Sequence, residues 1–169
     1  LAAVVALARP GALAYVDKYS KYVNEGVYEP VHEFFDSVLQ VTGGIPIFQE
    51  QAMKMSNKIG FSLEEAETLR RIIGKKKKKE MPEWKDRVFQ HVQDKKLDEN
   101  VGKVLWKVLD DSADYSFNLS HAVCYASLAA ETTYLKFKYP QNFFIECLKM
   151  AQHKSDPLSE VALIQEELK

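Results

Sequence analysis

The chain has 169 residues, of which 46% are hydrophobic, which suffices for one ordinary domain, or two small ones, with an apolar core. Charged residues make up 28% and the formal net charge is only −1, which argues against a generally basic, histone-like protein and against an acidic disordered tail. Any site for a polyanion must therefore be local.

Apolar residues recur at spacings of three and four along most of the chain, and the alternation typical of strands is almost absent. This pattern predicts an all-α fold with essentially no sheet. The first helix should end before Arg9-Pro-Gly-Ala12, because a proline disfavours the helical conformation of the residue before it. The opening run Leu1–Ala8 is apolar but short and has no basic lead-in, so we interpret it as neither a signal peptide nor a membrane span. Since the chain begins without methionine and within a helical pattern, we expect it to be a piece of a longer protein.

A second helix should carry Tyr15, Tyr19 and Tyr22 on one face, where ordinary half-buried packing explains them best. A turn at Asn24-Glu-Gly26 separates it from a helical stretch over about Pro30 to Leu39. The segment Thr42-Gly-Gly-Ile-Pro46 then breaks the pattern, and Pro46 suits the first position of the next helix. That helix should stop near Gly60, and its apolar stripe consists of Phe48, Ala52, Met55 and Ile59.

The next helix has a clear start, because Ser62-Leu-Glu-Glu65 forms a capping box. Gly74 is a plausible C-cap. Two further helices are indicated, one opened by Pro82 with Trp84, Val88 and Val92, and one marked by Val101, Val104, Leu105 and Val108.

Asn118 or Ser120 can cap a long helix that runs to about Lys138 and stops before Pro140. This helix is apolar on nearly every side, so we expect it to be mostly buried. The last helical stretches are Phe143 to Met150 and one that begins around Ser159.

Positive charge is concentrated in LRRIIGKKKKKEM, residues 69–81. On a helical wheel, Arg71 points nearly opposite the apolar side and Arg70 lies on its shoulder, with Lys75 and Lys76 following. Arginine forks and lysine ammonium groups suit phosphate oxygens. An equally open interpretation is that these cations complement the helix dipole and that the lysines form a solvated loop. No glycine-rich phosphate loop is present, which argues against an independent nucleotide-hydrolysing domain.

His121 and Tyr125 lie four residues apart and therefore share a helix face. They are either hydrogen-bonded polar groups of the core or the lining of a pocket at the positive end of the helix dipole. A metal site from Cys124 and His121 lacks a third and a fourth ligand. A cysteine nucleophile would need an oriented partner at a pocket, which this spacing does not establish. The other cysteine is Cys147; no disulfide framework is indicated, so a reducing compartment is expected.

Five groups of residues occur in a fixed order along nearly the whole chain. They are Arg9-Pro-Gly11; Phe48-Gln-Glu-Gln51; Gly60-Phe-Ser-Leu63 with Leu69-Arg-Arg71 and Gly74-Lys-Lys76; Phe117-Asn118 with Ser120-His-Ala122 and Tyr125; and Leu135-Lys136 with Tyr139-Pro140. In this order and at these spacings they resemble the fingers of the C-family replicative DNA polymerases, which include the α subunit of bacterial DNA polymerase III and its phage relatives.

The resemblance implies an all-α, multi-helix fingers domain over residues 1–150 and the start of a following helical segment over 151–169. Fingers of this family follow a palm that holds the catalytic aspartates and Mg²⁺, and they close over the incoming deoxynucleotide. We therefore expect DNA template-primer, dNTP, the upstream palm and, through downstream regions, a sliding clamp as partners. The expected location is the cytoplasm of a bacterial or phage-infected cell, with no membrane contact. The isolated chain should be inactive, with no catalytic residue and no metal ligand of its own.

The resemblance also implies roles for single residues. Contacts to the phosphates of the incoming dNTP are expected from Arg70, Arg71, Lys75 and Lys76. The nucleotide pocket is expected to contain Asn118, Ser120, His121 and Tyr125. DNA contacts are expected from Lys77, Lys78 and Lys79, whereas Gln49 and Gln51 have no assigned duty.

Two alternatives come from other classes. A helical nucleic-acid-binding module without a role in catalysis should bind DNA tightly on its own, with strong salt dependence. A helical scaffold for protein contacts should keep its nucleotide and DNA functions when the charges of Lys75–Lys79 are reversed.

Overall fold

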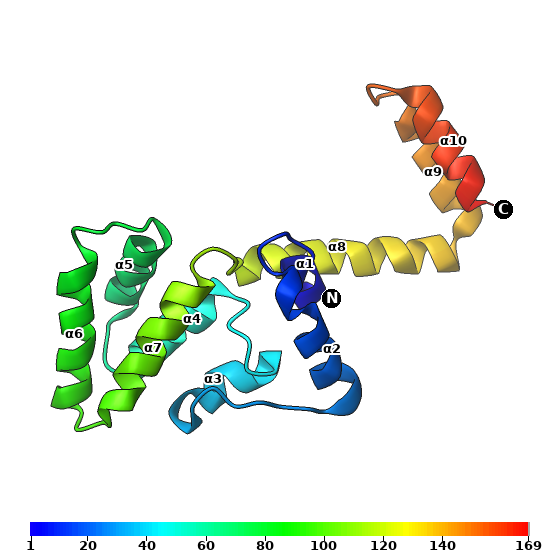
Figure 1. Ribbon diagram of the computed structural model, residues 1–169. Coiled ribbons are helices and arrows are strands. Elements are labelled where there is room, and N and C mark those ends of the chain that lie inside the picture. Colours follow the sequence, from blue (N-terminus) through cyan, green and yellow to red (C-terminus); the bar gives the residue numbers. More distant parts are fainter. Residues whose placement is uncertain (169) are drawn as a thin grey trace. The chain divides into compact units, whose positions relative to one another are not determined.

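A computed structural model describes residues 1–168 (Figure 1). Helices dominate these residues, and the only pairing of extended backbone among them is an isolated parallel bridge between Phe48 and Phe117. The all-α prediction is confirmed. The chain separates into two compact units, Leu1–Val123 and a second one that begins at Cys124. The predicted change of domain after residue 150 stays a prediction, because compactness alone does not define a functional domain.

The first unit is built from short N-terminal elements followed by longer helices. In chain order they are α1 (Ala2–Leu7), η1 (Leu13–Tyr15), α2 (Val16–Glu25), η2 (Glu33–Phe35), α3 (Asp36–Leu39), η3 (Gln40–Thr42), α4 (Gln49–Lys58), α5 (Leu63–Gly74), α6 (Met81–Asp94), α7 (Glu99–Ser112) and the first turn of α8 (Leu119–Lys138).

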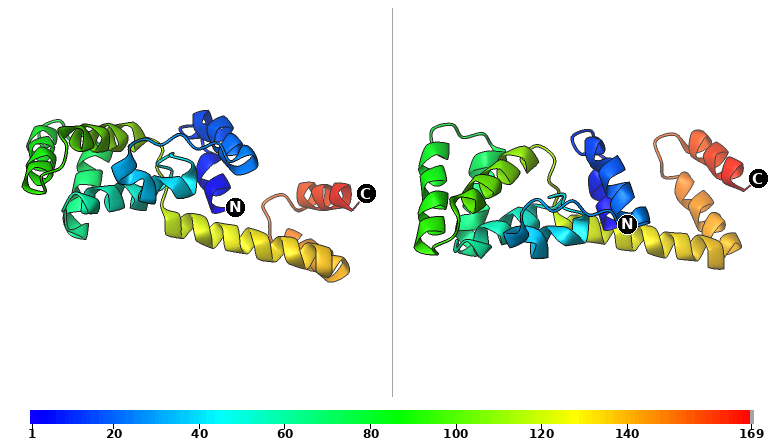
Figure 2. Two further views of the ribbon diagram at one scale, coloured as in Figure 1. Left: turned by 90° about the horizontal axis from the view of Figure 1, so that it is seen from below. Right: turned by 60° about the horizontal axis from the view of Figure 1, so that its bottom comes forward.

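Two apolar clusters hold this unit together. The larger one lies among α3, α4, α5, α6 and α7 and includes the fully buried Leu69, Val88 and Leu105. The smaller one joins α1 to the segment before α4 and to the start of α8, through residues such as Ala6 and Ile47. Figure 2 shows α5, α6 and α7 together at one end of the unit and α1 beside α2 at the other. The start of α8 is thereby fixed between α1 and α4.

Two predicted helix starts are confirmed by their capping bonds. The Glu65 N–H donates to Ser62 Oγ (3.2 Å), and the Ser62 N–H donates to Glu65 Oε2 (3.0 Å), as the capping box requires. The His121 N–H donates to Asn118 Oδ1 (2.8 Å), so Asn118 rather than Ser120 caps α8. The tyrosine stripe of α2 is half-buried, as predicted.

The prediction that Pro46 opens α4 is wrong. The helix begins at Gln49, and Phe48 is its extended N-cap (φ −107°, ψ 142°). The Phe117 N–H donates to the Ile47 carbonyl (2.8 Å), and the Gln49 N–H donates to the Phe117 carbonyl (2.9 Å). These two bonds keep the segment after Pro46 extended, a long-range effect that proline statistics do not contain.

Two other boundaries differ from the prediction. The stretch expected from Pro30 begins at Glu33 with a 3₁₀ turn, because His32 Nδ1 caps it by accepting from the Phe34 N–H (3.1 Å). Gly74 is the last residue of α5 rather than its cap. The left-handed residue is Lys76 (φ 49°), and the Lys77 N–H closes the end by donating to the Ile72 carbonyl (3.0 Å).

The second unit contains most of α8, then α9 (Pro140–Ala151) and α10 (Pro157–Glu167), which lie side by side. Both later helices start at a proline, and Asp156 caps α10 by accepting from the Ser159 N–H (3.2 Å). No described helix is both long enough and apolar enough to cross a membrane.

The prediction that α8 is mostly buried is wrong. Leu128, Tyr134 and Phe137 are 58%, 59% and 78% exposed. An apolar helix is buried only where another surface covers it, and the helical period alone does not say whether one does.

Candidate phosphate-binding site

Helix α5 presents two arginines opposite its buried face. Leu69, Ile72 and Ile73 anchor the helix in the larger core, each with at most 2% exposure. The side chain of Arg71 is 65% exposed and that of Arg70 only 24%, as expected for residues opposite and on the shoulder of the apolar side. Arg71 is therefore the more accessible of the two.

Glu67 binds both arginines. Arg70 donates from Nε to Glu67 Oε2 (2.8 Å) and from Nη2 to Oε1 (2.7 Å), which is a bidentate pair. Arg71 donates from Nε to the same Oε1 (2.7 Å). The hydrogen bonds from Arg70, followed by those from Arg71, lower the pKa of Glu67 to about 2 despite partial burial. Glu67 thus fixes Arg70, while the two terminal nitrogens of Arg71 make no hydrogen bond within residues 1–168.

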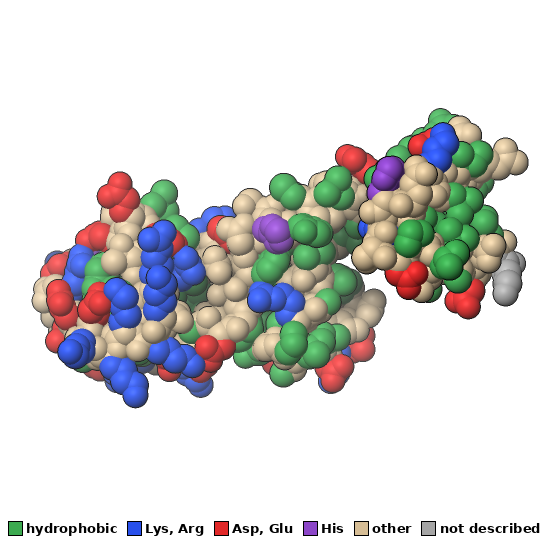
Figure 3. Space-filling view, turned by 90° about the horizontal axis from the view of Figure 1, so that it is seen from above, with side chains coloured by type: hydrophobic (Ala, Val, Ile, Leu, Met, Phe, Trp, Pro, Cys, Tyr) green, Lys and Arg blue, Asp and Glu red, His purple; other side chains and the backbone are tan. Residues whose placement is uncertain are grey.

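The five lysines that follow α5 are all exposed. Lys76 pairs with Asp114 (2.9 Å) and Lys77 pairs with Glu80 (2.9 Å). Lys75, Lys78 and Lys79 form no ion pair with any residue that the structure describes. Figure 3 shows Lys and Arg side chains gathered over the end of the first unit where α5 and α6 lie. This end of the molecule presents a local cationic surface although the whole chain is nearly neutral.

A second polar group surrounds the N-terminus of α8. Both carboxylate oxygens of Glu50 accept from the Leu119 N–H (3.1 and 2.9 Å), and Asn118 Nδ2 donates to Glu50 Oε1 (3.1 Å). Asn118 Oδ1 in turn accepts from Ser120 Oγ (2.6 Å). A carboxylate at this position is favoured by the helix dipole. Glu50 therefore organises the first turn of α8, which carries three of the four predicted pocket residues.

One ion pair connects the turn after α5 to this region, and the charge of Glu50 acts on Arg70 from a greater distance. The pKa of Arg70 is raised mainly by its hydrogen bonds to Glu67, and the negative charge of Glu50 contributes as well. Lys76 reaches Asp114, which lies shortly before Asn118 in the chain. The turn after α5 is thus linked to the segment that leads into α8.

His121 and Tyr125 are both exposed, Tyr125 by 56%, so the alternative that they are polar groups of the core is wrong. The His121 ring lies 5.3 Å from the Phe117 ring, edge to face. Tyr125 is one turn further along α8 and belongs to the second unit.

The residues Gln49 to Gln51, which had no assigned duty, form a support for this site. Gln51 is 5% exposed; its Nε2 donates to Thr42 Oγ1 (2.7 Å) and its Oε1 accepts from the Phe48 N–H (2.9 Å). Gln49 Nε2 donates to the Ser116 carbonyl (3.4 Å). Neither Glu50 nor Glu67 was singled out from the sequence, although the spacing of Glu67 to Arg70 and Arg71 is that of helical ion pairs.

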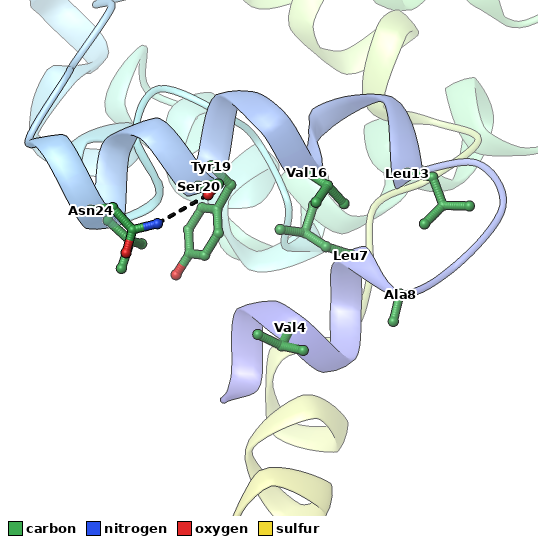
Figure 4. A pocket seen from close by; sticks show the side chains of 9 residues that line it. Val4, Leu7, Ala8, Leu13, Val16, Tyr19, Ser20 and Asn24 are labelled. Carbon is green, nitrogen blue, oxygen red and sulfur yellow. Dashed lines mark hydrogen bonds between the residues drawn. The ribbon is translucent and has the colours of Figure 1, made fainter.

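The groove between α1 and α2 differs from this site in its chemistry. It has a volume of about 390 Å³ and is lined mainly by apolar side chains such as Val4, Leu7 and Val16 (Figure 4). Its polar groups include Ser20 and Asn24, which bond to each other (3.0 Å), and none of its lining residues is charged, so it does not suit a phosphate. Within residues 1–168, no three or more His, Cys, Asp or Glu side chains gather as a metal site would require.

The fold and this surface together define a class: an all-α domain with guanidinium and ammonium groups beside the capped start of a long helix. Residues 1–96 match the family described as the bacterial DNA polymerase III alpha subunit finger domain. The chain belongs to this family, which confirms the resemblance drawn from the motifs.

Full-length relatives extend the similarity beyond the matched segment. DNA polymerase III subunit alpha of Aquifex aeolicus is 40% identical over 161 residues, which cover 92% of this chain. The proteins of the same name from Borreliella burgdorferi and Thermus aquaticus are 36% and 33% identical, each over 94% of this chain. The chain spans about 14% of the length of each of these relatives.

Proposed function

We propose that the chain is the fingers portion of a template-directed DNA polymerase and that it holds the incoming deoxynucleoside triphosphate over the template-primer during DNA replication. The observation that carries this proposal is the exposed guanidinium of Arg71, on a helix whose opposite face is anchored in the larger core, in a chain of the polymerase III alpha finger family.

The cationic groups have different roles. Arg71, Lys75 and Lys76 contact the phosphates of the nucleotide, while Arg70, pinned by Glu67, adds positive charge from a fixed position. Preorganised cations of this kind stabilise charge that spreads over the transferred phosphoryl group without a reorganisation cost at the moment of reaction.

The residues at the start of α8 form the other side of the pocket. Asn118, Ser120 and His121 lie in its first turn, and Tyr125 follows on the same helix and contacts the nascent base pair. Lys77, Lys78 and Lys79 contact the DNA backbone, where exposed lysines act as mobile point charges.

The metal chemistry is expected elsewhere in the polymerase. Mg²⁺ prefers carboxylate and water oxygens, whereas the side chains proposed to face the phosphates here are mainly cations. When bound to an aspartate-bearing palm, Mg²⁺ would supply activation of the primer hydroxyl. The chain described here then binds and orients the nucleotide, and alone it polymerises nothing. The palm, DNA and a sliding clamp are its proposed partners, in the cytoplasm of a bacterial or phage-infected cell.

The exposed, unpaired Lys75, Lys78 and Lys79 favour one second candidate, a nucleic-acid-binding module that acts without catalysis. Salt titration of DNA binding by the isolated chain separates the two. Tight binding with a steep salt dependence would support the module, and weak binding that needs the palm would support fingers.

The kinetic test replaces Arg71 by Ala in the polymerase that carries this chain. Loss of one charge-assisted phosphate contact should lower kcat/KM for the nucleotide by about 10- to 100-fold. The matched control is Lys103→Ala, which removes an exposed cation of α7 that pairs with Glu99. Equal kcat/KM values for Arg71→Ala and the unmodified polymerase would refute the proposal.

A further inference from the structure

A third guanidinium, that of Arg9, lies beside the start of α8, although nothing in the proposed function uses it. Its Cζ is 4.8 Å from the centroid of the Phe117 ring, which is a cation–π contact. The other neighbour of that ring is His121, 5.3 Å away between centroids. Phe117 therefore contacts both Arg9, in the turn after α1, and His121, in the first turn of α8.

The backbone around these contacts is firmly positioned. Phe117 is held on both sides by its hydrogen bonds with Ile47 and Gln49. The turn that carries Arg9 packs closely on the segment before Phe117, because a Cβ added to Gly11 would lie 3.3 Å from the Asp114 carbonyl oxygen. Ala12, at the end of this turn, is completely buried. The backbone position of Arg9 is thus set by close packing within the fold.

The chemistry of Arg9 differs from that of Arg70. Arg9 is exposed, and no carboxylate of residues 1–168 forms an ion pair with it. A cation–π contact engages the charge of a guanidinium but none of its five N–H donors. Arg70, by contrast, is held by two hydrogen bonds to Glu67. Arg9 therefore retains a planar fork of donors on Phe117, the residue that directly precedes Asn118 and whose ring contacts His121.

We propose that Arg9 is a further phosphate-binding residue of this site, with Phe117 as the aromatic platform that positions its guanidinium at the start of α8. This inference rests on the proposed function. The phosphate oxygens belong either to the incoming nucleotide or to the DNA backbone, and the two sources give different results in the same experiment.

The experiment compares Arg9→Gln and Arg9→Lys with the unmodified polymerase that carries this chain. If the nucleotide is the source, Arg9→Gln raises the dNTP KM by about 10-fold and leaves the Kd for primer-template unchanged in the absence of dNTP. If the backbone is the source, the Kd for primer-template rises and the slope of log K against log salt concentration decreases by about one unit. Arg9→Lys keeps the charge but not the fork, so it should recover only part of the loss.

A structural role alone would move none of these values in a protein that keeps its melting temperature. The inference is overturned if Arg9→Gln, folded as judged by circular dichroism, changes the dNTP KM, the DNA Kd and the salt slope by less than about twofold, within the usual scatter of surface substitutions. If Arg9→Gln does not fold, Arg9→Lys is the deciding variant. A higher dNTP KM or a higher Kd for primer-template supports the inference, and unchanged values of both overturn it.

Arg71→Ala, measured in parallel, keeps the two proposals apart. If Arg71→Ala lowers kcat/KM for the nucleotide and Arg9→Gln leaves all its constants unchanged, only the inference about Arg9 is refuted. If neither variant changes these constants, the proposed function is refuted as well. If only Arg9→Gln changes them, phosphate binding is retained at the start of α8 and excluded at α5.

Discussion

Glu67 is the residue whose replacement reveals most about the α5 cations. In Glu67→Gln the side chain keeps its size but loses the charge that both arginines share. Arg70, whose side chain is only 24% exposed, is then left with the more remote charge of Glu50. A partly buried cation without a close partner is costly, so the variant should be less stable than the unmodified chain.

The size of the effect follows from the pKa of Glu67, which is lowered from 4.5 to about 2. The full difference would correspond to about 3 kcal/mol, at 1.36 kcal/mol for each pKa unit. Because the Glu67 side chain is 29% exposed, solvent screens the pair, and a loss of about 1 kcal/mol is expected at neutral pH.

The pH dependence has a definite sign. A carboxylate whose pKa is lower in the folded state stabilises the fold above its unfolded pKa, and this contribution is lost as the pH falls through the folded value. The free energy of unfolding of the unmodified chain should therefore approach that of Glu67→Gln as the pH falls from 4.5 towards 2.

Urea unfolding at pH 7 and at several acidic pH values measures both quantities. The matched control is Glu99→Gln, which breaks the i,i+4 pair with Lys103, where both side chains are at least 60% exposed. It should cost less than Glu67→Gln. Identical urea midpoints for Glu67→Gln and the unmodified chain at pH 7 would refute the reasoning, and Arg70 would then be as available to a phosphate as Arg71.

Two further substitutions test the support of the site and the helix ends. Gln51→Leu leaves the buried Phe48 N–H without its acceptor and removes one of the bonds of Thr42 Oγ1, so the free energy of unfolding from urea titration should fall by about 1–3 kcal/mol; an unchanged midpoint would contradict the network. Lys96 is left-handed (φ 53°) at the end of α6, so Lys96→Gly should raise the free energy of unfolding by about 0.5–1 kcal/mol. Lys95 has φ −85°, so the control Lys95→Gly should lower the free energy of unfolding. The reverse order would show that Lys96 carries no backbone strain.

The sequence predicted those features of the fold that depend on neighbouring residues. The capping box at Ser62 and the apolar stripes of α5 and α6 need only local spacing, and they are found where predicted. Features that depend on distant segments were not predictable. The two hydrogen bonds that keep Pro46 out of a helix come from Phe117, and the exposure of α8 depends on which surfaces are available to cover it.

The site shows the same division. The placement of Arg70 and Arg71 opposite the apolar face followed from the helical period. Glu67 precedes Arg70 and Arg71 by three and four residues, so its ion pairs with them are a local feature that helical spacing indicates. Glu50 and Arg9 had no local signal, since each acts on the start of α8 from a different part of the chain.

The central claim is that the guanidinium of Arg71 binds the phosphates of an incoming nucleotide. Its most direct test is the Kd of the correct dNTP in a complex of the polymerase with a chain-terminated primer-template, where no chemistry follows binding. Arg71→Ala should weaken this Kd by about 10-fold or more, while the Kd for the primer-template stays the same. A dNTP Kd equal to that of the unmodified polymerase would contradict the claim.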